Sequence, residues 1–241
     1  MARLRLVAAL SLACAAPVLA GPPYITDDPE PTTLRHWEIY NFLDIDGRGG
    51  DVDGVAGLDL NYGAAPGLQL TATIPMAFER EAGAGWSAGR GDLELAAKYR
   101  FVDDEKHGWQ AAVFPRMILP TAARGLGGAR ARLLLPLWLQ KDVGKTSVFG
   151  GAGYEINPGP ANRDFWQAGI AVTHDFTDKL QIGTEISWQS ADTRGGDSST
   201  GVDLGVIRNL GGPYALLLAA GPGFSGGAVS YHSYAALSLN F

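Results

Sequence analysis

The chain has a single cysteine, Cys14, which lies in an apolar stretch close to the first residue. One cysteine cannot form an intramolecular disulfide or build a thiolate metal site. After residue 20 the sequence has no thiol at all. We therefore expect no disulfide, no metal centre and no cysteine nucleophile, and no motif indicates a cofactor.

Charge is also scarce, and positive charge is scarcer than negative. Only 18% of the residues are charged, and 25 acidic residues against 19 Lys and Arg give a net charge of -6. Nucleic-acid binding needs clustered Lys and Arg, so we expect no nucleic-acid partner. Because 46% of the residues are hydrophobic, disorder of the low-hydrophobicity kind is excluded as well.

Long apolar runs are absent after residue 20, where no segment offers the about 18 apolar residues that a transmembrane helix needs. The apolar run at residues 6–16 is too short to span a bilayer, and Arg3 and Arg5 precede it. With small residues at 18–20, this pattern is typical of a cleaved secretory signal peptide. We predict a signal peptide at residues 1–20 and a mature chain that begins at Gly21.

The sequence is rich instead in two-residue alternation, which predicts strands with one apolar and one polar face. Residues 68–78, for example, alternate apolar side chains with Gln69, Thr71 and Thr73. Most candidates have the roughly 9–11 residues of a tilted transmembrane strand. Twelve strands are predicted, at residues 35–46, 53–62, 67–79, 91–102, 109–119, 131–141, 147–157, 164–176, 179–190, 201–209, 214–224 and 231–241.

Short turns alternate with longer loops between these strands, as in outer-membrane barrels. We predict an all-β fold, an antiparallel up-and-down transmembrane β-barrel of about 12 strands over residues 35–241 with both termini periplasmic. Residues 21–34 form a periplasmic segment that either plugs the barrel mouth or hangs free. Its Asp27, Asp28 and Glu30 are interpreted as a solvated acidic turn in preference to a calcium site.

Aromatic residues and prolines test the barrel prediction in opposite directions. Aromatic side chains of the apolar face fall near the strand ends, as the two membrane interfaces favour; they are Trp37, Tyr62, Tyr99, Trp109, Phe176 and Phe241 at one end and Phe78, Trp166, Trp188, Phe224 and Tyr231 at the other. A soluble β-sandwich is the alternative, but it needs no such girdles. Four prolines lie inside predicted strands, where we expect bulges or local strand ends; they are Pro75, Pro115, Pro136 and Pro222.

Three stretches are similar to a known family. GPPYITDDPEPTTLRHWEIYNF at residues 21–42, GDLELAAKYRF at 91–101 and LPT…PLWLQKDVG…GGAGYEIN across 119–157 resemble the putative meta-pathway phenol-degradation family. The sequence departs from the family pattern Pro-Thr-Gly at Pro120-Thr121-Ala122. The resemblance implies an outer-membrane barrel with a transporter-like role, and it assigns no substrate and no functional residues.

The side chains on the polar faces of these strands would line the lumen of the barrel. The charged candidates there are Glu38, Asp44, Asp59, Glu94, Lys98, Arg100, Arg116, Arg132, Glu155, Glu185 and Asp203. All four basic residues come from the fourth to sixth predicted strands, and apart from Glu94 the carboxylates come from the other strands. One hypothesis is therefore a basic wall that faces an acidic wall across a wet passage for small solutes. The alternative is that the charges pair with one another in a nearly closed interior.

These features favour a passive channel or transporter-like protein for small molecules, aromatic compounds included, over a non-conducting structural or adhesive barrel. An outer-membrane lipid hydrolase is a further alternative, but no catalytic residues are predicted. His174 and Asp175 are neighbours on one strand and point to opposite faces, and no Gly-x-Ser-x-Gly elbow is present.

The last predicted strand alternates strictly up to its final residue. Tyr231, Leu237, Leu239 and Phe241 share one face. This pattern resembles the carboxy-terminal signal that the barrel-assembly machinery reads. The expected partners are therefore outer-membrane lipids, the barrel-assembly machinery and a small-molecule solute.

Overall fold

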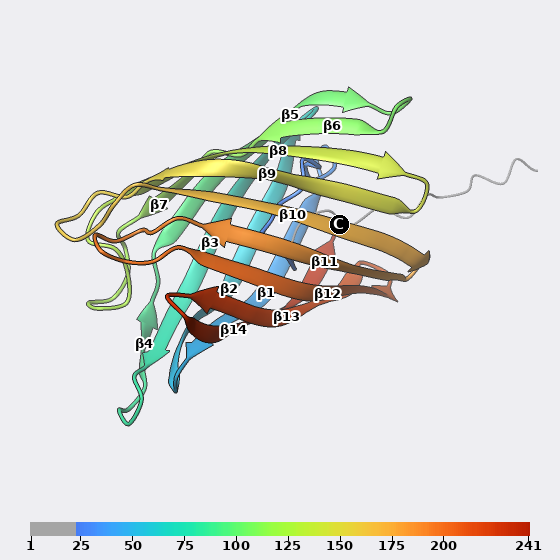
Figure 1. Ribbon diagram of the computed structural model, residues 1–241. Helices are drawn as coiled ribbons and strands as arrows, with labels where there is room; N and C mark the ends of the chain where they lie inside the picture. The colour runs from blue at the N-terminus through green and yellow to red at the C-terminus, as the bar shows by residue number, and fades with distance from the viewer. Residues whose placement is uncertain (1–22) are drawn as a thin grey trace, which may run out of the picture.

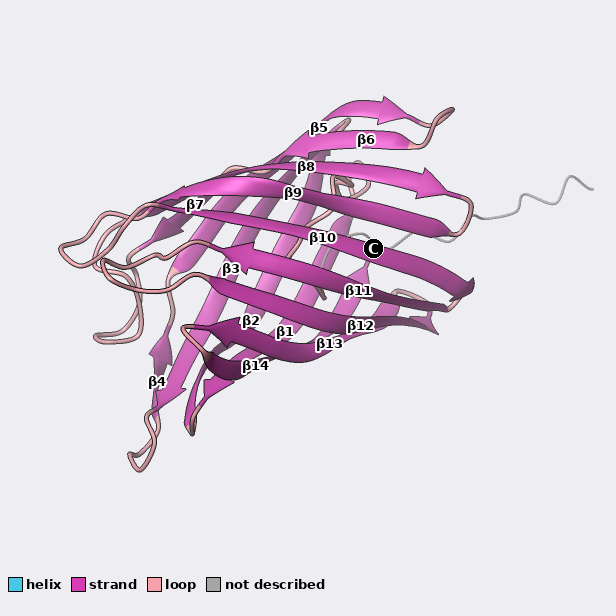
Figure 2. Ribbon diagram, in the orientation of Figure 1, coloured by secondary structure: helices cyan, strands magenta, loops and turns pink. Residues whose placement is uncertain are grey.

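The computed structural model describes residues 23–241 and is entirely β within that range (Figures 1 and 2). The predicted signal peptide at residues 1–20 lies outside the described residues. No helix in the described part of the chain is long and apolar enough to cross a membrane. The strands are β1 (Trp37–Arg48), β2 (Asp51–Ala65), β3 (Leu68–Arg80), β4 (Ser87–Arg90), β5 (Leu93–Asp104), β6 (Trp109–Val113), β7 (Arg116–Leu119), β8 (Arg132–Val143), β9 (Thr146–Ile156), β10 (Phe165–Thr177), β11 (Leu180–Gln189), β12 (Ser199–Gly211), β13 (Tyr214–Ser225) and β14 (Ala228–Asn240).

The strands form one antiparallel sheet that closes on itself. β1 pairs with β14 from Glu38↔Asn240 to Gly47↔Tyr231, so the first and last strands complete the wall. β4 and β5 both pair with β3, so they share one place in the wall. β6 and β7 both pair with β5 on one side and with β8 on the other, so they share another. The fold is therefore the predicted 12-stranded barrel, and closure leaves no free edge.

The four in-strand prolines coincide with interruptions in the hydrogen-bonded ladder. Pro115 lies in the gap between β6 and β7. The ladder skips Pro75 on the side of β4 and β5, Pro136 on the side of β6 and β7, and Pro222 on the side of β12. Proline has no backbone N–H to donate, and each of these prolines faces a gap where the ladder needs no donor. The wall therefore accommodates all four prolines. The predicted local irregularities are confirmed, although only Pro115 ends a strand.

The outer wall is apolar. On β3 and β8 the side chains of Leu70, Ile74, Leu135 and Leu139 are each about half exposed, while Gln69 and Thr71 are buried on the opposite face. The predicted aromatic residues lie outside near the strand ends, where Trp37 stacks obliquely on Tyr62 at 4.8 Å between ring centroids. This surface is what a bilayer solvates, with aliphatic side chains between two sets of rings.

Part of the barrel interior is packed. Tyr40 and Phe42 of β1 contact Leu217 of β13 and Ile207 of β12 in a buried apolar cluster. These residues belong to the inward parity, so the lumen is not uniformly polar. The rest of the interior is polar and contains the site described below.

Candidate functional site

The segment before β1 lies inside the barrel. At the end that carries the short turns, the Arg35 amide donates to the Gly63 carbonyl at 2.7 Å. Deeper in the lumen, the Thr32 amide donates to Gln69 Oε1 at 2.8 Å. Pro23, Thr26 and Pro29 are among the most deeply buried residues of the molecule. The segment therefore packs against the inner wall along its length.

Asp27 is the electrostatic centre of this segment. Its Oδ1 accepts from Lys98 Nζ at 2.9 Å, and its Oδ2 accepts from Arg116 Nη2 at 2.7 Å. Asp28 Oδ1 lies 3.7 Å from the same lysine nitrogen. Asp27 and Asp28 are only 9% and 4% exposed, so the interpretation of a solvated acidic turn was wrong. Burial is possible because two cations on the wall compensate the carboxylates.

The segment is also held on the far wall. Glu185 of β11 accepts from the amides of Ile25 and Thr26 at 3.1 and 2.9 Å. The ring of Tyr24 covers Gly205, where an added Cβ would lie 2.5 Å from ring carbons. Gly183 pairs with Gly205 across β11 and β12, so the inner wall has no side chain at this point and leaves room for the ring. We call these two residues the glycine floor. Residues 24–32 thus cross the lumen from β11 and β12 to β3 and β5.

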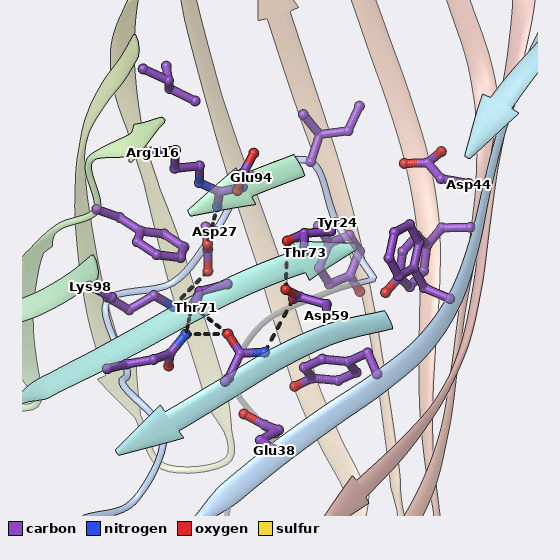
Figure 3. Close-up of a pocket in the computed structure, with 18 of the residues that line it drawn as sticks. Tyr24, Asp27, Glu38, Asp44, Asp59, Thr71, Thr73, Glu94, Lys98 and Arg116 are labelled. Atoms are coloured by element: carbon purple, nitrogen blue, oxygen red, sulfur yellow. Dashed lines mark hydrogen bonds and ion pairs between the residues drawn. The ribbon is translucent and has the colours of Figure 1, made fainter. Parts of the chain in front are cut away.

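Beside the segment lies a cavity of about 370 Å³. Figure 3 shows Asp59 in its midst, with Lys98 and Arg116 on one side and Asp44 on the other. Asp59 accepts from Thr73 Oγ1 at 2.8 Å and from Asn61 Nδ2 at 3.2 Å. We call this space the luminal cavity.

The structure brings six of the eleven predicted luminal charges to this cavity, and it distributes the other five elsewhere in the interior. Those at the cavity are Glu38, Asp44, Asp59, Glu94, Lys98 and Arg116. Of the others, Arg132 pairs with Glu155 at 3.0 Å, Arg100 with Asp103 at 2.6 Å, Glu185 holds the segment, and Asp203 contacts His232.

The expected basic wall facing an acidic wall is not what the structure shows. Each of the four basic side chains is in an ion pair, and Lys98 and Arg116 take theirs chiefly from the N-terminal segment. Arg116 also lies 3.6 Å from Glu94. Desolvated charges need partners, and the N-terminal segment and neighbouring strands supply them. The alternative of paired charges is the better description.

His232 is a luminal residue that sequence reasoning missed. Its Nε2 lies 3.0 Å from Asp44 Oδ1, and its Nδ1 lies 3.0 Å from Asp203 Oδ2. An imidazole satisfies two carboxylates only when both ring nitrogens carry protons. The ring thereby links β14 to β1 and to β12. The sequence did offer a signal for this role, because His232 lies on the face of the last predicted strand opposite to Tyr231, Leu237 and Leu239.

His174, the histidine considered for hydrolysis, does not meet Asp175. Its Nδ1 lies 2.9 Å from the Thr146 hydroxyl, and Asp175 accepts from Gln181 instead. A histidine needs an orienting carboxylate to act as the base of a nucleophilic set, and His174 contacts none among the described residues.

Glu30 lies in the segment and belongs to no strand. Burial, together with the nearby Asp28 carboxylate, raises the pKa of Glu30 from 4.5 to about 7. Lys98 and Arg100 oppose this rise without cancelling it. The segment therefore contains one group that changes charge near neutral pH.

A closed ladder, an apolar outer wall with aromatic ends and a charged interior define a transmembrane β-barrel of the outer-membrane type. Neither protein-family models nor curated proteins give a match to the chain.

Solved structures do resemble it. A COG4313 outer-membrane channel from Pseudomonas putida F1 matches with a TM-score of 0.73 and 15% identity over 89% of this chain and 98% of that chain. The KdgM porin matches at 0.58 and 11% over 85% and 99%, respectively. The translocator domain of the autotransporter NalP from Neisseria meningitidis matches at 0.55 and 13% over 85% and 88%. At these identities the likeness establishes the barrel fold.

Proposed function

We propose that this protein is an outer-membrane channel for small molecules and that residues 23–34 form a plug in its lumen. The observation that carries the proposal is the luminal cavity, which combines polar and charged side chains inside an apolar wall. A barrel that only fills the membrane has no need of buried charges, which are costly unless each is compensated. The predicted signal peptide supports export, with both termini on the periplasmic side.

The contacts of the segment support a plug that can be displaced. It is held by hydrogen bonds and ion pairs to the wall, and no strand pairing longer than the single bridge Leu34↔Gly63 fixes it. Such polar contacts can be exchanged for water when the segment leaves. We infer that residues 23–34 obstruct the lumen and that solutes pass when this segment withdraws.

For the cargo, we propose small molecules that include aromatic compounds. Resemblance to the phenol-degradation family supports aromatic compounds, and Phe42, Trp138 and Tyr234 at the cavity offer them apolar surface. The barrels similar in structure include a channel and a porin, which supports passive passage.

Planar-bilayer recordings of a variant that lacks residues 23–34 test the proposal. We expect the wild type to conduct rarely and the deletion variant to show stable single-channel steps several times more often. Heat-modifiable migration in gel electrophoresis would confirm that the deleted protein still forms a barrel. A folded deletion variant without any conductance would refute the channel and favour the non-conducting structural barrel, which the packed apolar cluster also suits.

A further inference from the structure

Carboxylates outnumber cations around the luminal cavity. Five acidic side chains line it, namely Asp27, Glu38, Asp44, Asp59 and Glu94, against the two basic side chains Lys98 and Arg116. Both cations already pair with Asp27. Arg116 also lies 3.6 Å from Glu94, and Asp44 contacts His232, so Glu38 and Asp59 are the lining carboxylates without an ion-pair partner among the described residues, and Figure 3 labels both in the cavity.

The same cavity has aromatic walls. Phe42 and Tyr234 stack at 6.3 Å between ring centroids, with an interplanar angle of 9°. Phe114 is already covered by the guanidinium of Arg116, which lies 4.2 Å from its ring centroid. The stacked pair on β1 and β14 has no such cation over it among the described residues. Aromatic faces next to carboxylates favour organic cations, because ring quadrupole and negative charge attract them together.

Trp138 adds an unused donor. The residue is only 4% exposed and lines the cavity, yet its Nε1–H has no hydrogen-bond acceptor among the described residues. Buried indole N–H groups usually have a partner, because leaving one unpaired is costly. An acceptor on a bound molecule would supply that partner.

We propose that the luminal cavity is a binding site for small organic cations that carry an apolar or aromatic body and a hydrogen-bond acceptor. The ammonium group lies between Asp59 and Glu38, and the body lies against Phe42 and Tyr234. Trp138 donates to the acceptor. The volume of about 370 Å³ suits a compound of this size. The inference deepens the proposed function, since it names the class of solute that the channel selects.

Three probes of nearly equal shape test the charge selectivity. Tyramine is cationic, 4-ethylphenol is neutral and 3-(4-hydroxyphenyl)propanoate is anionic, and all three keep a phenol that can accept from Trp138. Titration calorimetry on the full-length protein in detergent measures their binding directly. We expect the Kd of tyramine to be at least tenfold lower than that of either analogue. Equal or weaker binding of tyramine would overturn the inference.

Variants then locate the site. Asp59→Asn and Glu38→Gln should each weaken tyramine binding about tenfold, and Trp138→Phe, which keeps a ring but removes the N–H, should weaken it several-fold. Glu105→Gln removes an exposed carboxylate in the β5–β6 turn and should leave the Kd unchanged. Unchanged binding in both acidic variants, with folding verified by heat-modifiable migration, would contradict the assignment.

The binding assay is independent of transport. Selective tyramine binding by a protein whose deletion variant never conducts would support the cavity assignment and refute the channel. Conductance of the deletion variant, combined with no preference for tyramine, would support the channel and refute the selectivity.

Discussion

Asp27 shows how a residue without regular structure organises the lumen. It lies ten residues before β1, yet it accepts from Lys98 of β5 and from Arg116 of β7. Lys98, which is only 2% exposed, would otherwise be buried with little compensation. The segment and the wall therefore depend on one another. Sequence alone hides this dependence, because alternation identifies the inward cations but not a partner outside the strands.

Glu30 makes the plug sensitive to pH. The pKa of Glu30 is about 7 when the segment is docked, against 4.5 for a glutamate in water. Docking therefore favours the protonated form. The contribution of Glu30 to docking is greatest below pH 4.5, declines as the pH rises from 4.5 to 7, and changes no further above that range. We expect the open probability in planar bilayers to be at least about tenfold higher at pH 8 than at pH 5.

The matched variant is Glu30→Gln, which is neutral at every pH. It should stay closed at pH 8 and lose most of the difference between the two pH values. If the variant keeps the full pH dependence of the wild type, another group is responsible.

At the scale of strands, the wall could be read from the sequence and the contents of the lumen could not. A period of two residues located all twelve wall positions, because a bilayer outside and a polar interior demand strict alternation. The prolines marked the interrupted pairings. The path of residues 23–36 has no periodicity, and its docking depends on glycines of distant strands. Gly183 and Gly205 look like ordinary strand residues until Tyr24 is placed on them.

This glycine floor can be tested at Gly205. A Cβ there would lie 2.5 Å from the Tyr24 ring, so Gly205→Ala should displace the ring and loosen the plug. We expect about a tenfold higher open probability than in the wild type, measured in planar bilayers, from a loss of about 1.4 kcal/mol in docking.

Gly201→Ala on the same strand is the control, since its Cβ would approach the rotatable Ser187 hydroxyl at 2.7 Å and no atom of the segment. It should leave the open probability unchanged. Equal opening in the two variants would show that any added side chain on β12 disturbs the barrel, and the specific role of the floor would be refuted.

For the whole molecule, Phe241 belongs both to the seam that closes the barrel and to the proposed signal for its assembly in the membrane. The Phe241 amide donates to the Trp37 carbonyl at 3.0 Å, and the Trp37 amide donates to Phe241 at 2.7 Å. These bonds close the ladder beyond Glu38↔Asn240, while the Phe241 ring is 61% exposed on the outer face. The backbone of this residue therefore has a structural role in closure that its ring does not share.

This separation permits a test of the proposed assembly signal, formed by Tyr231, Leu237, Leu239 and Phe241. Deletion of Phe241 removes both hydrogen bonds and the ring, whereas Phe241→Ala removes only the ring. If the assembly machinery reads the ring, both variants should lower the heat-modifiable barrel in outer-membrane fractions several-fold. Both should still fold when refolded in detergent, with Phe241→Ala as stable as the wild type. Normal membrane levels of Phe241→Ala would refute the signal and leave the residue with a role in closure alone.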